Sequence, residues 1–221
     1  MRSEVYNIDC LEYMRTLPDK CFDLAIADPP YQIGTSKSSH GGAGKMKNRV
    51  MNQQAKKFTE WDKAPSQEFF EELKRVSKNQ IIWGGNYFDL PPTRCFVCWD
   101  KVQPWENFSQ VEYAWTSFDY PSKIFKYDNR TGGKIHPTQK PTELYRYLLS
   151  IFAPVGGVIF DPMMGSQSSR IAAYKMGFDY VGCELDKEYF DKGCERFDRE
   201  CNGIVKTKDG RTFKQTTLFE L

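Results

Sequence analysis

The tetrapeptide Asp28-Pro29-Pro30-Tyr31 follows directly on the apolar run 22–27 and combines residue types that suit a flat amine. The carboxylate of Asp28 can accept a hydrogen bond from an exocyclic N–H group. Pro29 and Pro30 fix their φ angles and donate no N–H, so their carbonyl oxygens are acceptors on a stiff loop. Tyr31 offers a ring on which a planar base can stack. An ordinary strand end with a Pro-Pro turn has the same residues, and the rest of the chain decides between the two interpretations.

A second distinctive segment, Asp161-Pro162-Met163-Met164-Gly165-Ser166, lies between the apolar run 158–160 and a helical pattern over 167–176. A strand, a turn of small residues and a helix start form a corner where backbone approaches a nucleotide-like ligand closely. The segment is not a phosphate loop, because it has one glycine and an acid that would repel phosphate. An acid here suits a ligand with an ammonium group. Glu184 ends the run 179–183, and this spacing of about 20 residues suits ribose hydroxyls.

These segments need strands and helices to position them, and the chain alternates between the two patterns. Strands are predicted over 22–27, 80–83, 95–99, 111–115, 158–160 and 179–183, and helices over 10–17, after Ser66, and over 142–152, 167–176 and 186–201. This alternation predicts an α/β fold with a parallel sheet. A long loop is expected over 32–64, irregular structure over 118–134, and a polar, peripheral tail from 202.

The seven cysteines are scattered and odd in number, and the sequence shows no signal peptide or apolar run of membrane-spanning length. These features predict a reducing, cytoplasmic setting. Cys95 and Cys98 form a C-x-x-C pattern inside an apolar run, without a second pair. We interpret them as strand packing and expect no metal site.

In their order along the chain, these motifs resemble those of the DNA amino-methyltransferases, which use S-adenosylmethionine to methylate adenine N6 or cytosine N4. Residues 28–31 match the family's D-P-P-Y catalytic motif, and residues 161–166 resemble its D-P-F-x-G-S cofactor motif. Residues 136–141 read H-P-T-Q-K-P, as in many members, and residues 7–12 resemble its G-D-C-L-E segment. The catalytic motif precedes the cofactor motif, which is the order of the beta group.

The resemblance implies the Rossmann-like α/β sheet of S-adenosylmethionine-dependent methyltransferases. That sheet has seven strands, mostly parallel, with helices on both faces and with the catalytic and cofactor loops at the strands' carboxyl ends. We expect one catalytic domain over residues 1–221. It would carry a loop insertion at 32–64 and a short target-recognition segment at 117–135.

The resemblance also implies roles for individual residues. Asp28 and the carbonyl of Pro29 would accept hydrogen bonds from the N6 amine of a flipped-out adenine that stacks on Tyr31. Asp161 would meet the cofactor's ammonium group and Glu184 its ribose. The cofactor-binding set expected in full is Asp9, Cys10, Asp28, Thr138, Lys140, Asp161, Pro162, Gly165, Ser166 and Glu184, with Pro30 and Tyr31 in the catalytic loop.

Within this set, Asp9 and the Cys10 backbone N–H are candidates for the adenine edge of the cofactor, and Thr138 and Lys140 for its methionine carboxylate. Asp9 could equally be only a helix cap, and Lys140 only a surface lysine. His136 is expected to be a turn residue rather than a catalytic base.

The chain departs from the family pattern at Gln167, where a glycine is usual. Either the side chain crowds the methionine part of the cofactor, or the loop is slightly remodelled to make room for it. The first residue of the catalytic motif is Asp, which in this family favours adenine, whereas Ser favours cytosine.

Double-stranded DNA is the expected partner, although the net charge is only +2. Residues 32–59 contain no Asp or Glu, and their lysines and arginines suit a loop that faces phosphate, although a solvated loop is the usual reason for such a run. The predicted DNA-binding residues are Lys45, Lys47, Arg49, Lys56, Lys57, Lys123, Lys126 and Arg130. A homodimer, a separate restriction endonuclease and association with the nucleoid stay open, and no membrane partner is expected.

Three other interpretations compete with adenine methylation. N4-cytosine methylation would use the same fold. A non-catalytic DNA-binding relative, with its pocket disabled by Gln167, is a second. Methylation of a glutamine amide in a protein is a third, but those enzymes typically begin the motif with Asn and place the cofactor motif upstream, and both features disagree here.

Overall fold

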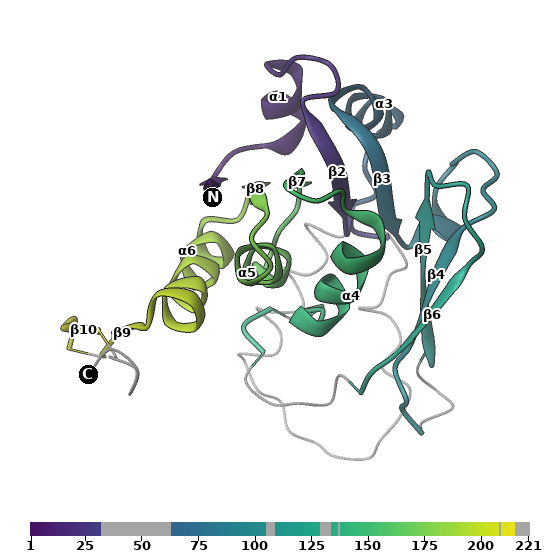
Figure 1. Ribbon diagram of the computed structural model, residues 1–221. Coiled ribbons are helices and arrows are strands. Elements are labelled where there is room, and N and C mark those ends of the chain that lie inside the picture. The colour runs from purple at the N-terminus through teal and green to yellow at the C-terminus, as the bar shows by residue number, and fades with distance from the viewer. Residues whose placement is uncertain (32–62, 105–108, 129–133, 137, 208, 215–221) are drawn as a thin grey trace, which may run out of the picture.

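A computed structural model describes residues 1–31, 63–104, 109–128, 134–136, 138–207 and 209–214 (Figure 1). Its main feature is an eight-stranded sheet with the order β1-β8-β7-β2-β3-β5-β4-β6. The strands are β1 (Ser3–Tyr6), β2 (Phe22–Ala27), β3 (Ser77–Trp83), β4 (Phe96–Asp100), β5 (Val111–Thr116), β6 (Lys123–Lys126), β7 (Val158–Asp161) and β8 (Asp179–Cys183).

Five neighbouring strands, β1, β8, β7, β2 and β3, run parallel to one another. Strand β5 is antiparallel to both β3 and β4, and β6 is parallel to β4. The carboxyl ends of the five parallel strands therefore meet at one edge of the sheet. The prediction of a mostly parallel α/β sheet is confirmed. The described sheet has eight strands, whereas the family resemblance implied seven, and the residue pattern had indicated no strand at β1 or β6.

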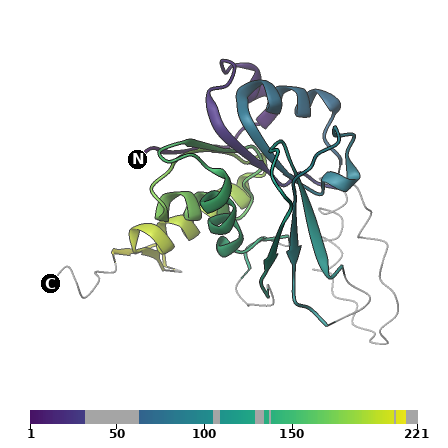
Figure 2. The ribbon, with the colours of Figure 1, turned by 45° about the vertical axis from the view of Figure 1, so that its right-hand side comes forward.

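Helices cover both faces of this sheet (Figures 1 and 2). The helices are α1 (Cys10–Arg15), α3 (Gln67–Val76), α4 (Thr142–Phe152), α5 (Ser168–Lys175) and α6 (Lys187–Phe197), with a short 3-10 turn, η2, at Gly85–Tyr87. Alternate residues of β2 enter different cores. Leu24 and Ile26 pack with α4 and α5, while Ala25 and Ala27 pack with α1 and α3. This alternation is what a strand buried on both faces requires.

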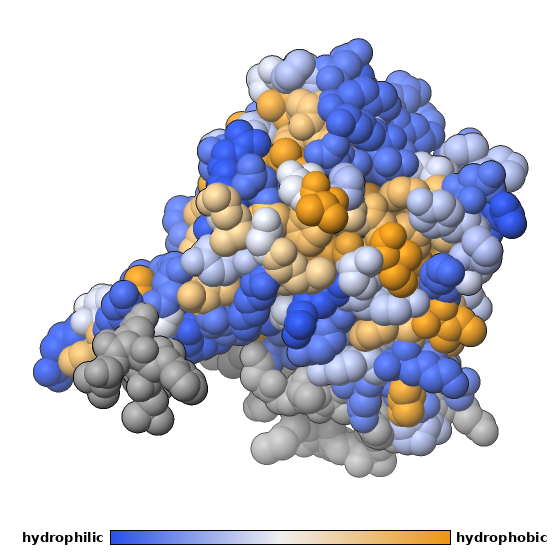
Figure 3. Space-filling model, viewed as in Figure 1, coloured by the Kyte–Doolittle hydropathy of each residue, from blue (hydrophilic) through white to orange (hydrophobic). Residues whose placement is uncertain are grey.

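Helix α3 shows how an amphipathic pattern fixes a helix on the sheet. Phe69, Phe70, Leu73 and Val76 are all buried, as their spacing predicts. Each such side chain contributes about 1.5–3 kcal/mol when it leaves water. The outer side of the helix carries Gln, Glu and Lys residues, and the molecular surface over α3 is hydrophilic (Figure 3).

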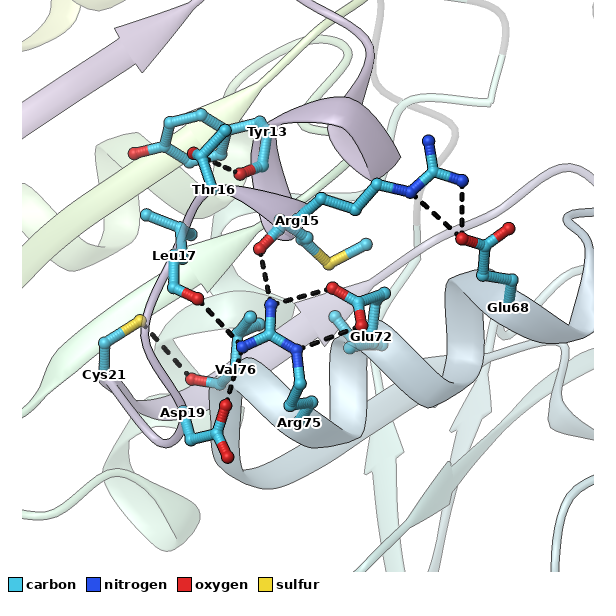
Figure 4. Close-up of polar contacts among 12 residues, drawn as sticks. Tyr13, Arg15, Thr16, Leu17, Asp19, Cys21, Glu68, Glu72, Arg75 and Val76 are labelled. Atoms are coloured by element: carbon cyan, nitrogen blue, oxygen red, sulfur yellow. Dashed lines mark hydrogen bonds and ion pairs between the residues drawn. The ribbon is translucent and has the colours of Figure 1, made fainter.

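Arg75 of α3 ties the connection between α1 and β2 to the sheet (Figure 4). Its guanidinium donates to the carbonyls of Met14, at 2.7 Å, and Leu17, at 2.8 Å. The carboxylates of Glu72 and Asp19 pair with the same group at 2.8 and 2.7 Å. One of these carbonyls lies in the last turn of α1 and the other in the connection that follows it, so the guanidinium joins both to α3. These bonds also fix the start of the strand that leads to Asp28.

Two segments differ from the prediction. The stretch 118–134 contains β6, because Lys123–Lys126 pairs with β4 and Phe125 packs on Tyr147 with ring centroids 4.9 Å apart. The tail forms a small antiparallel hairpin of β9 (Ile204–Lys206) and β10 (Thr212–Lys214). Before it, the last helix leaves the α form at Phe197 and continues as a π-helical turn, η3 (Asp198–Asn202), which ends at Gly203 with φ of 66°.

The predicted loop insertion at 32–64 lies outside the described residues, apart from Lys63 and Ala64. In the described part of the chain, no helix is long and apolar enough to cross a membrane. The described His, Cys, Asp and Glu residues form no group suited to a metal ion, and all seven cysteines are free thiols. Cys95 is buried just before β4 and Cys98 lies within that strand, so the interpretation as strand packing is confirmed.

Candidate active site

The carboxyl ends of the parallel strands surround a cavity of about 650 Å³. Asp9 follows β1, Asp28 follows β2, and Glu184 follows β8, so residues far apart in the sequence reach one space. Of the residues predicted to act, the cavity is lined by Asp9, Cys10, Asp28, Pro29, Pro30, Tyr31, Thr138, Lys140, Pro162, Gly165, Ser166 and Glu184. The structure therefore brings both predicted motifs to a single site of a size typical for ligands.

The carboxylate of Asp28 is held on one side by two donors. The Lys140 ammonium lies 2.5 Å from Oδ1, and the Tyr31 hydroxyl donates to the same oxygen at 2.7 Å. Within the described residues, Oδ2 has no contact of this kind. Asp28 therefore has one carboxylate oxygen that is already bound by two donors and one oxygen that can accept a hydrogen bond from a ligand.

The Tyr31 ring is fixed by other aromatic side chains. It stacks on Tyr87 with centroids 5.2 Å apart and meets the edge of Phe88 at 6.2 Å. Burial is the main reason that the pKa of Tyr31 lies well above its usual value, with the Asp28 charge next, so its hydroxyl remains a donor. These contacts fix the orientation of the ring in this structure.

Asp161, the last residue of β7, lies behind the cavity wall and is only 2% exposed. Its Oδ1 accepts from the Met163 N–H at 3.0 Å, and its Oδ2 accepts from the Ser169 hydroxyl at 2.5 Å. Burial raises the pKa of Asp161 to about 7. In this structure the carboxylate supports the turn 162–165 from beneath, rather than lining the cavity as expected.

Glu184 does face the cavity, from the loop after β8. Its two carboxylate oxygens accept from the backbone N–H groups of Gly165, at 2.9 Å, and Asp186, at 2.8 Å. Burial raises the pKa of Glu184, although these hydrogen bonds oppose the change. Glu184 therefore couples the cofactor-motif turn to the start of α6, and each oxygen keeps a lone pair for a hydroxyl donor.

Asp9 is the N-cap of α1, because its side chain accepts from the N–H groups of Leu11 and Glu12. The interpretation of Asp9 as a helix cap is confirmed, and its carboxylate lines the cavity as well. Burial, followed by the charge of Asp9, raises the pKa of the Cys10 thiol to about 12. Cys10 is therefore a neutral thiol in the wall of the cavity and no thiolate nucleophile.

His136 begins a turn, because its carbonyl accepts from the Gln139 N–H at 3.1 Å. Its ring packs against Tyr189, and its Nδ1 lies 3.1 Å from the Thr138 hydroxyl. Burial lowers the pKa of His136 to about 4, so the ring is neutral at pH 7. This geometry agrees with a turn residue.

Gln167 is not among the residues that line the cavity, so of the two alternatives the structure does not support crowding. The residue has φ of 60° at the N-cap of α5, and its side chain turns away towards α6. There Nε2 donates to the Phe190 carbonyl at 3.3 Å, and Oε1 accepts from Arg170 at 2.9 Å. A Cβ on Gly193 would lie 2.7 Å from Gln167 Cγ, so a glycine in α6 makes room for this side chain.

Three residues at or next to the site carried no motif signal. Glu112 of β5 and Tyr145 of α4 line the cavity. Arg196 of α6 donates to the Ser166 carbonyl at 3.0 Å and to the Ser168 hydroxyl at 2.8 Å, so it braces the cofactor-motif turn. Of the two tyrosines of α4, Tyr145 is buried and Tyr147 is only partly buried.

Most of the predicted DNA-binding residues lie outside the described residues: Lys45, Lys47, Arg49, Lys56, Lys57 and Arg130. Lys123 and Lys126 are described and lie on β6. Lys126 is exposed, with Asp100 3.8 Å away.

Comparison with known proteins gives one family. The N6_N4_Mtase family model, described as a DNA methylase, matches residues 93–195. The chain is 26% identical over 240 residues to the type II methyltransferase M.HinfI of Haemophilus influenzae. That match covers 83% of this chain and 65% of M.HinfI, so the chain spans less than two thirds of that relative. The resemblance to DNA amino-methyltransferases is thereby confirmed.

Two solved structures share the fold. The M1.HpyAVI–SAM complex is 21% identical, with a TM-score of 0.57, and the match covers 87% of this chain and 98% of that one. The PvuII DNA methyltransferase, which is cytosine-N4-specific, is 15% identical, with a TM-score of 0.59 and coverage of 92% and 94%. At these identities the likeness establishes the methyltransferase fold.

Proposed function

This chain is a homologue of the N6/N4 DNA methylases, and on that premise we propose that it transfers a methyl group from S-adenosylmethionine to the exocyclic N6 of a flipped-out adenine in DNA. The observation that carries the proposal is the shared cavity. It places the available acceptor of Asp28 and the ring of Tyr31 in the same space as Glu184 and the 162–166 turn.

The cavity suits S-adenosylmethionine in its hydrogen-bonding groups as well as in its size. Glu184 offers carboxylate oxygens for the ribose hydroxyls, and Asp9, with the Cys10 backbone, lies where an adenine edge would be read. Gly165 has φ of 46°, which lets the turn pass close to a ligand. Thr138 remains our candidate for the methionine carboxylate.

Two assignments from the sequence change with the geometry. Lys140 makes its ion pairs with Asp28 and Glu112, so we assign it to the catalytic carboxylate instead of the methionine carboxylate. We propose that Asp161 acts on the cofactor mainly through the turn that it supports, because both of its oxygens accept hydrogen bonds from that turn and from α5.

For the substrate, the rigid Tyr31 ring is the proposed stacking surface for the flipped base. Base flipping costs a few kcal/mol in lost pairing and stacking, and one aromatic stack returns roughly 1–3 kcal/mol. Asp28 Oδ2 and the Pro29 carbonyl would accept the two amine hydrogens. Two acceptors hold the nitrogen with its lone pair out of conjugation with the ring.

S-adenosylmethionine, when bound, supplies an electrophilic methyl group. The chain's own contribution is alignment, since the fixed Asp28–Tyr31 loop presents the amine to that methyl group. The nitrogen becomes acidic only as it gains the methyl group, so no strong base is needed beforehand. Asp28 is the acceptor in place for the proton that leaves. No covalent bond between enzyme and base is required.

The choice of adenine rests on Asp28 as the first residue of the catalytic motif. N4-cytosine methylation is the alternative, and PvuII, with the same fold, is cytosine-N4-specific. Both bases present a flat exocyclic amine, so the described geometry suits either, and the product identifies which is used.

We further propose double-stranded DNA as the partner, with phosphate contacts from the basic loop after Tyr31 and from Lys123 and Lys126. Such contacts set register without reading sequence. In a plot of the logarithm of the DNA association constant against the logarithm of the salt concentration, each lost phosphate contact should reduce the steepness of the slope by about 0.9. An unchanged slope in a Lys45/Lys47/Lys56/Lys57 quadruple variant would contradict the loop's role.

Cofactor binding and methyl transfer can be tested separately. Asp28→Ala should bind S-adenosylmethionine in calorimetry like the wild type, yet transfer no labelled methyl group to DNA. Glu184→Gln should weaken cofactor binding. Loss of cofactor binding in Asp28→Ala, with residual transfer, would contradict the assignment. A wild type that fails to bind the cofactor would instead support the non-catalytic DNA-binding relative.

A further inference from the structure

A row of alternating charges leads to the catalytic carboxylate from the antiparallel side of the sheet. Lys101, just after β4, lies with Nζ 2.5 Å from Oε1 of Glu112. Oε2 of Glu112 lies 3.2 Å from Nζ of Lys140, which in turn is 2.5 Å from Oδ1 of Asp28. The row therefore joins β4, β5, the H-P-T-Q-K-P segment and the loop after β2.

Lys140 is the central member of this row and is deeply buried, with 4% of its side chain exposed. Burial opposes its charge, but the carboxylates of Asp28 and Glu112 outweigh that effect and raise the pKa of the ammonium. Its Nζ also lies 5.1 Å from the ring centroid of Trp83, where a cation is attracted to the ring face. Lys140 is thus a charged group held in one position.

Glu112 has an unusual environment for a carboxylate. Its Oε2 is a buried atom that accepts no hydrogen bond within the described residues, although the Lys140 ammonium faces it. Burial opposes the charge of this carboxylate, but Lys140 and Lys101 outweigh that effect and lower the pKa of Glu112. No motif of the sequence requires an acid here. The two lysines therefore keep Glu112 ionised, and its charge faces the Lys140 ammonium.

The ammonium is shared between two carboxylates, and this sharing bears on Asp28. Lys140 and the Tyr31 hydroxyl both contact Oδ1 of Asp28, which leaves Oδ2 without a hydrogen-bond donor among the described residues, and Asp28 lines the cavity. With Glu112 neutral, the ammonium would pair with Asp28 alone. It would then be free to shift towards either oxygen, and Asp28 would become a poorer acceptor for an amine.

We propose that Glu112 is a positioning residue for methyl transfer, which acts through Lys140 to keep Oδ2 of Asp28 available to the substrate's exocyclic amine. The proposal rests on the methyltransferase function proposed for this site. It concerns a residue outside all the recognised motifs and gives the buried lysine of the H-P-T-Q-K-P segment a role beside the catalytic acid.

The test is Glu112→Gln, which preserves the shape of the side chain and removes its charge. We expect kcat to fall about tenfold or more, while the Kd for S-adenosylmethionine and the KM for DNA stay within twofold. Since a carboxylate beside Lys140 is lost, the pKa of that ammonium falls. The alkaline decline of kcat should therefore begin at a lower pH than in the wild type.

A double-mutant cycle tests whether Glu112 acts through Lys140. In a Lys140→Met background, Glu112→Gln should have no further effect on kcat, because the intermediary is gone. Glu68→Gln is the matched control. Glu68 pairs with Arg15 at 2.5 Å on the exposed surface of α1 and α3 (Figure 4). This control should leave kcat and its pH profile unchanged.

Wild-type kcat and pH profile in Glu112→Gln would overturn the proposal. Additive effects of the two substitutions in the cycle would also overturn it. A fall in kcat together with weaker cofactor binding and a lower melting temperature would indicate a structural role and would overturn it as well. Failure of the proposed function gives a different result, since the wild type itself would then produce no methylated nucleoside.

Discussion

The ring of Tyr31 lies directly against the backbone of Gly84, so closely that a Cβ built on Gly84 would be 2.2 Å from Cε1 of Tyr31. Gly84 directly follows β3 and has φ of 67°, a conformation that residues with side chains rarely adopt. The neighbouring strand thus supplies a flat support for the catalytic tyrosine. The position needs a glycine for contact as well as for conformation.

Gly84→Ala should therefore displace Tyr31 and lower kcat by about tenfold or more, with cofactor Kd within twofold. Gly177→Ala is the control, because Gly177 also has a positive φ, of 80°, but its Cβ would meet nothing within 4 Å. Both variants should lose about 1–2 kcal/mol of stability from backbone strain. Equal kcat values for the two variants in a steady-state methylation assay would contradict the account.

Gln167→Gly, which restores the residue usual in the family, should leave the Kd for S-adenosylmethionine within twofold of the wild type. The reason is that the Gln167 side chain points towards α6 and makes no part of the cavity wall. Gln167→Ala should be less stable than Gln167→Gly by about 1 kcal/mol, because alanine is strained at this positive φ. Calorimetry that shows tenfold tighter binding in the glycine variant would argue against the described geometry.

Asp161→Asn should stabilise the protein relative to the wild type, and increasingly so as pH rises from about 4 to about 7. Burial raises the folded pKa of Asp161 from 3.8 to about 7, so the folded state binds a proton that the unfolded state has lost. The wild type therefore loses roughly 1.4 kcal/mol per pH unit across this window, whereas the Asn variant does not. Urea unfolding at several pH values measures the difference. A pH-independent difference would contradict the burial of this carboxyl.

The sequence predicts the ends of the parallel strands well, because apolar runs followed by Asp28 or Glu184 mark both the strand and its functional end. It also predicts the apolar face of α3. Glu112, Tyr145 and Gly84 could not be found in this way. Their roles depend on which strand lies beside which, and only the sheet order places β5 and the end of β3 next to the loop after β2.

Side-chain direction accounts for the remaining differences. The position of Gln167 in the motif left open whether its side chain would crowd the cofactor, and the structure shows its amide bonded to α6 instead. Strand β6 is too short and too polar for a clear apolar pattern, and its pairing with β4 defines it. The basic residues of the predicted DNA-binding loop stay predictions, because they lie outside the described residues.

The most direct test identifies the methylated base. The protein would be incubated with labelled S-adenosylmethionine and unmethylated DNA of mixed sequence, and the DNA would be digested to nucleosides for mass spectrometry, with Asp28→Ala as the control. We predict labelled N6-methyladenine with the wild type and none with Asp28→Ala. N4-methylcytosine would contradict the choice of adenine, and the absence of any methylated nucleoside, with cofactor binding intact, would contradict the proposal that DNA is the substrate.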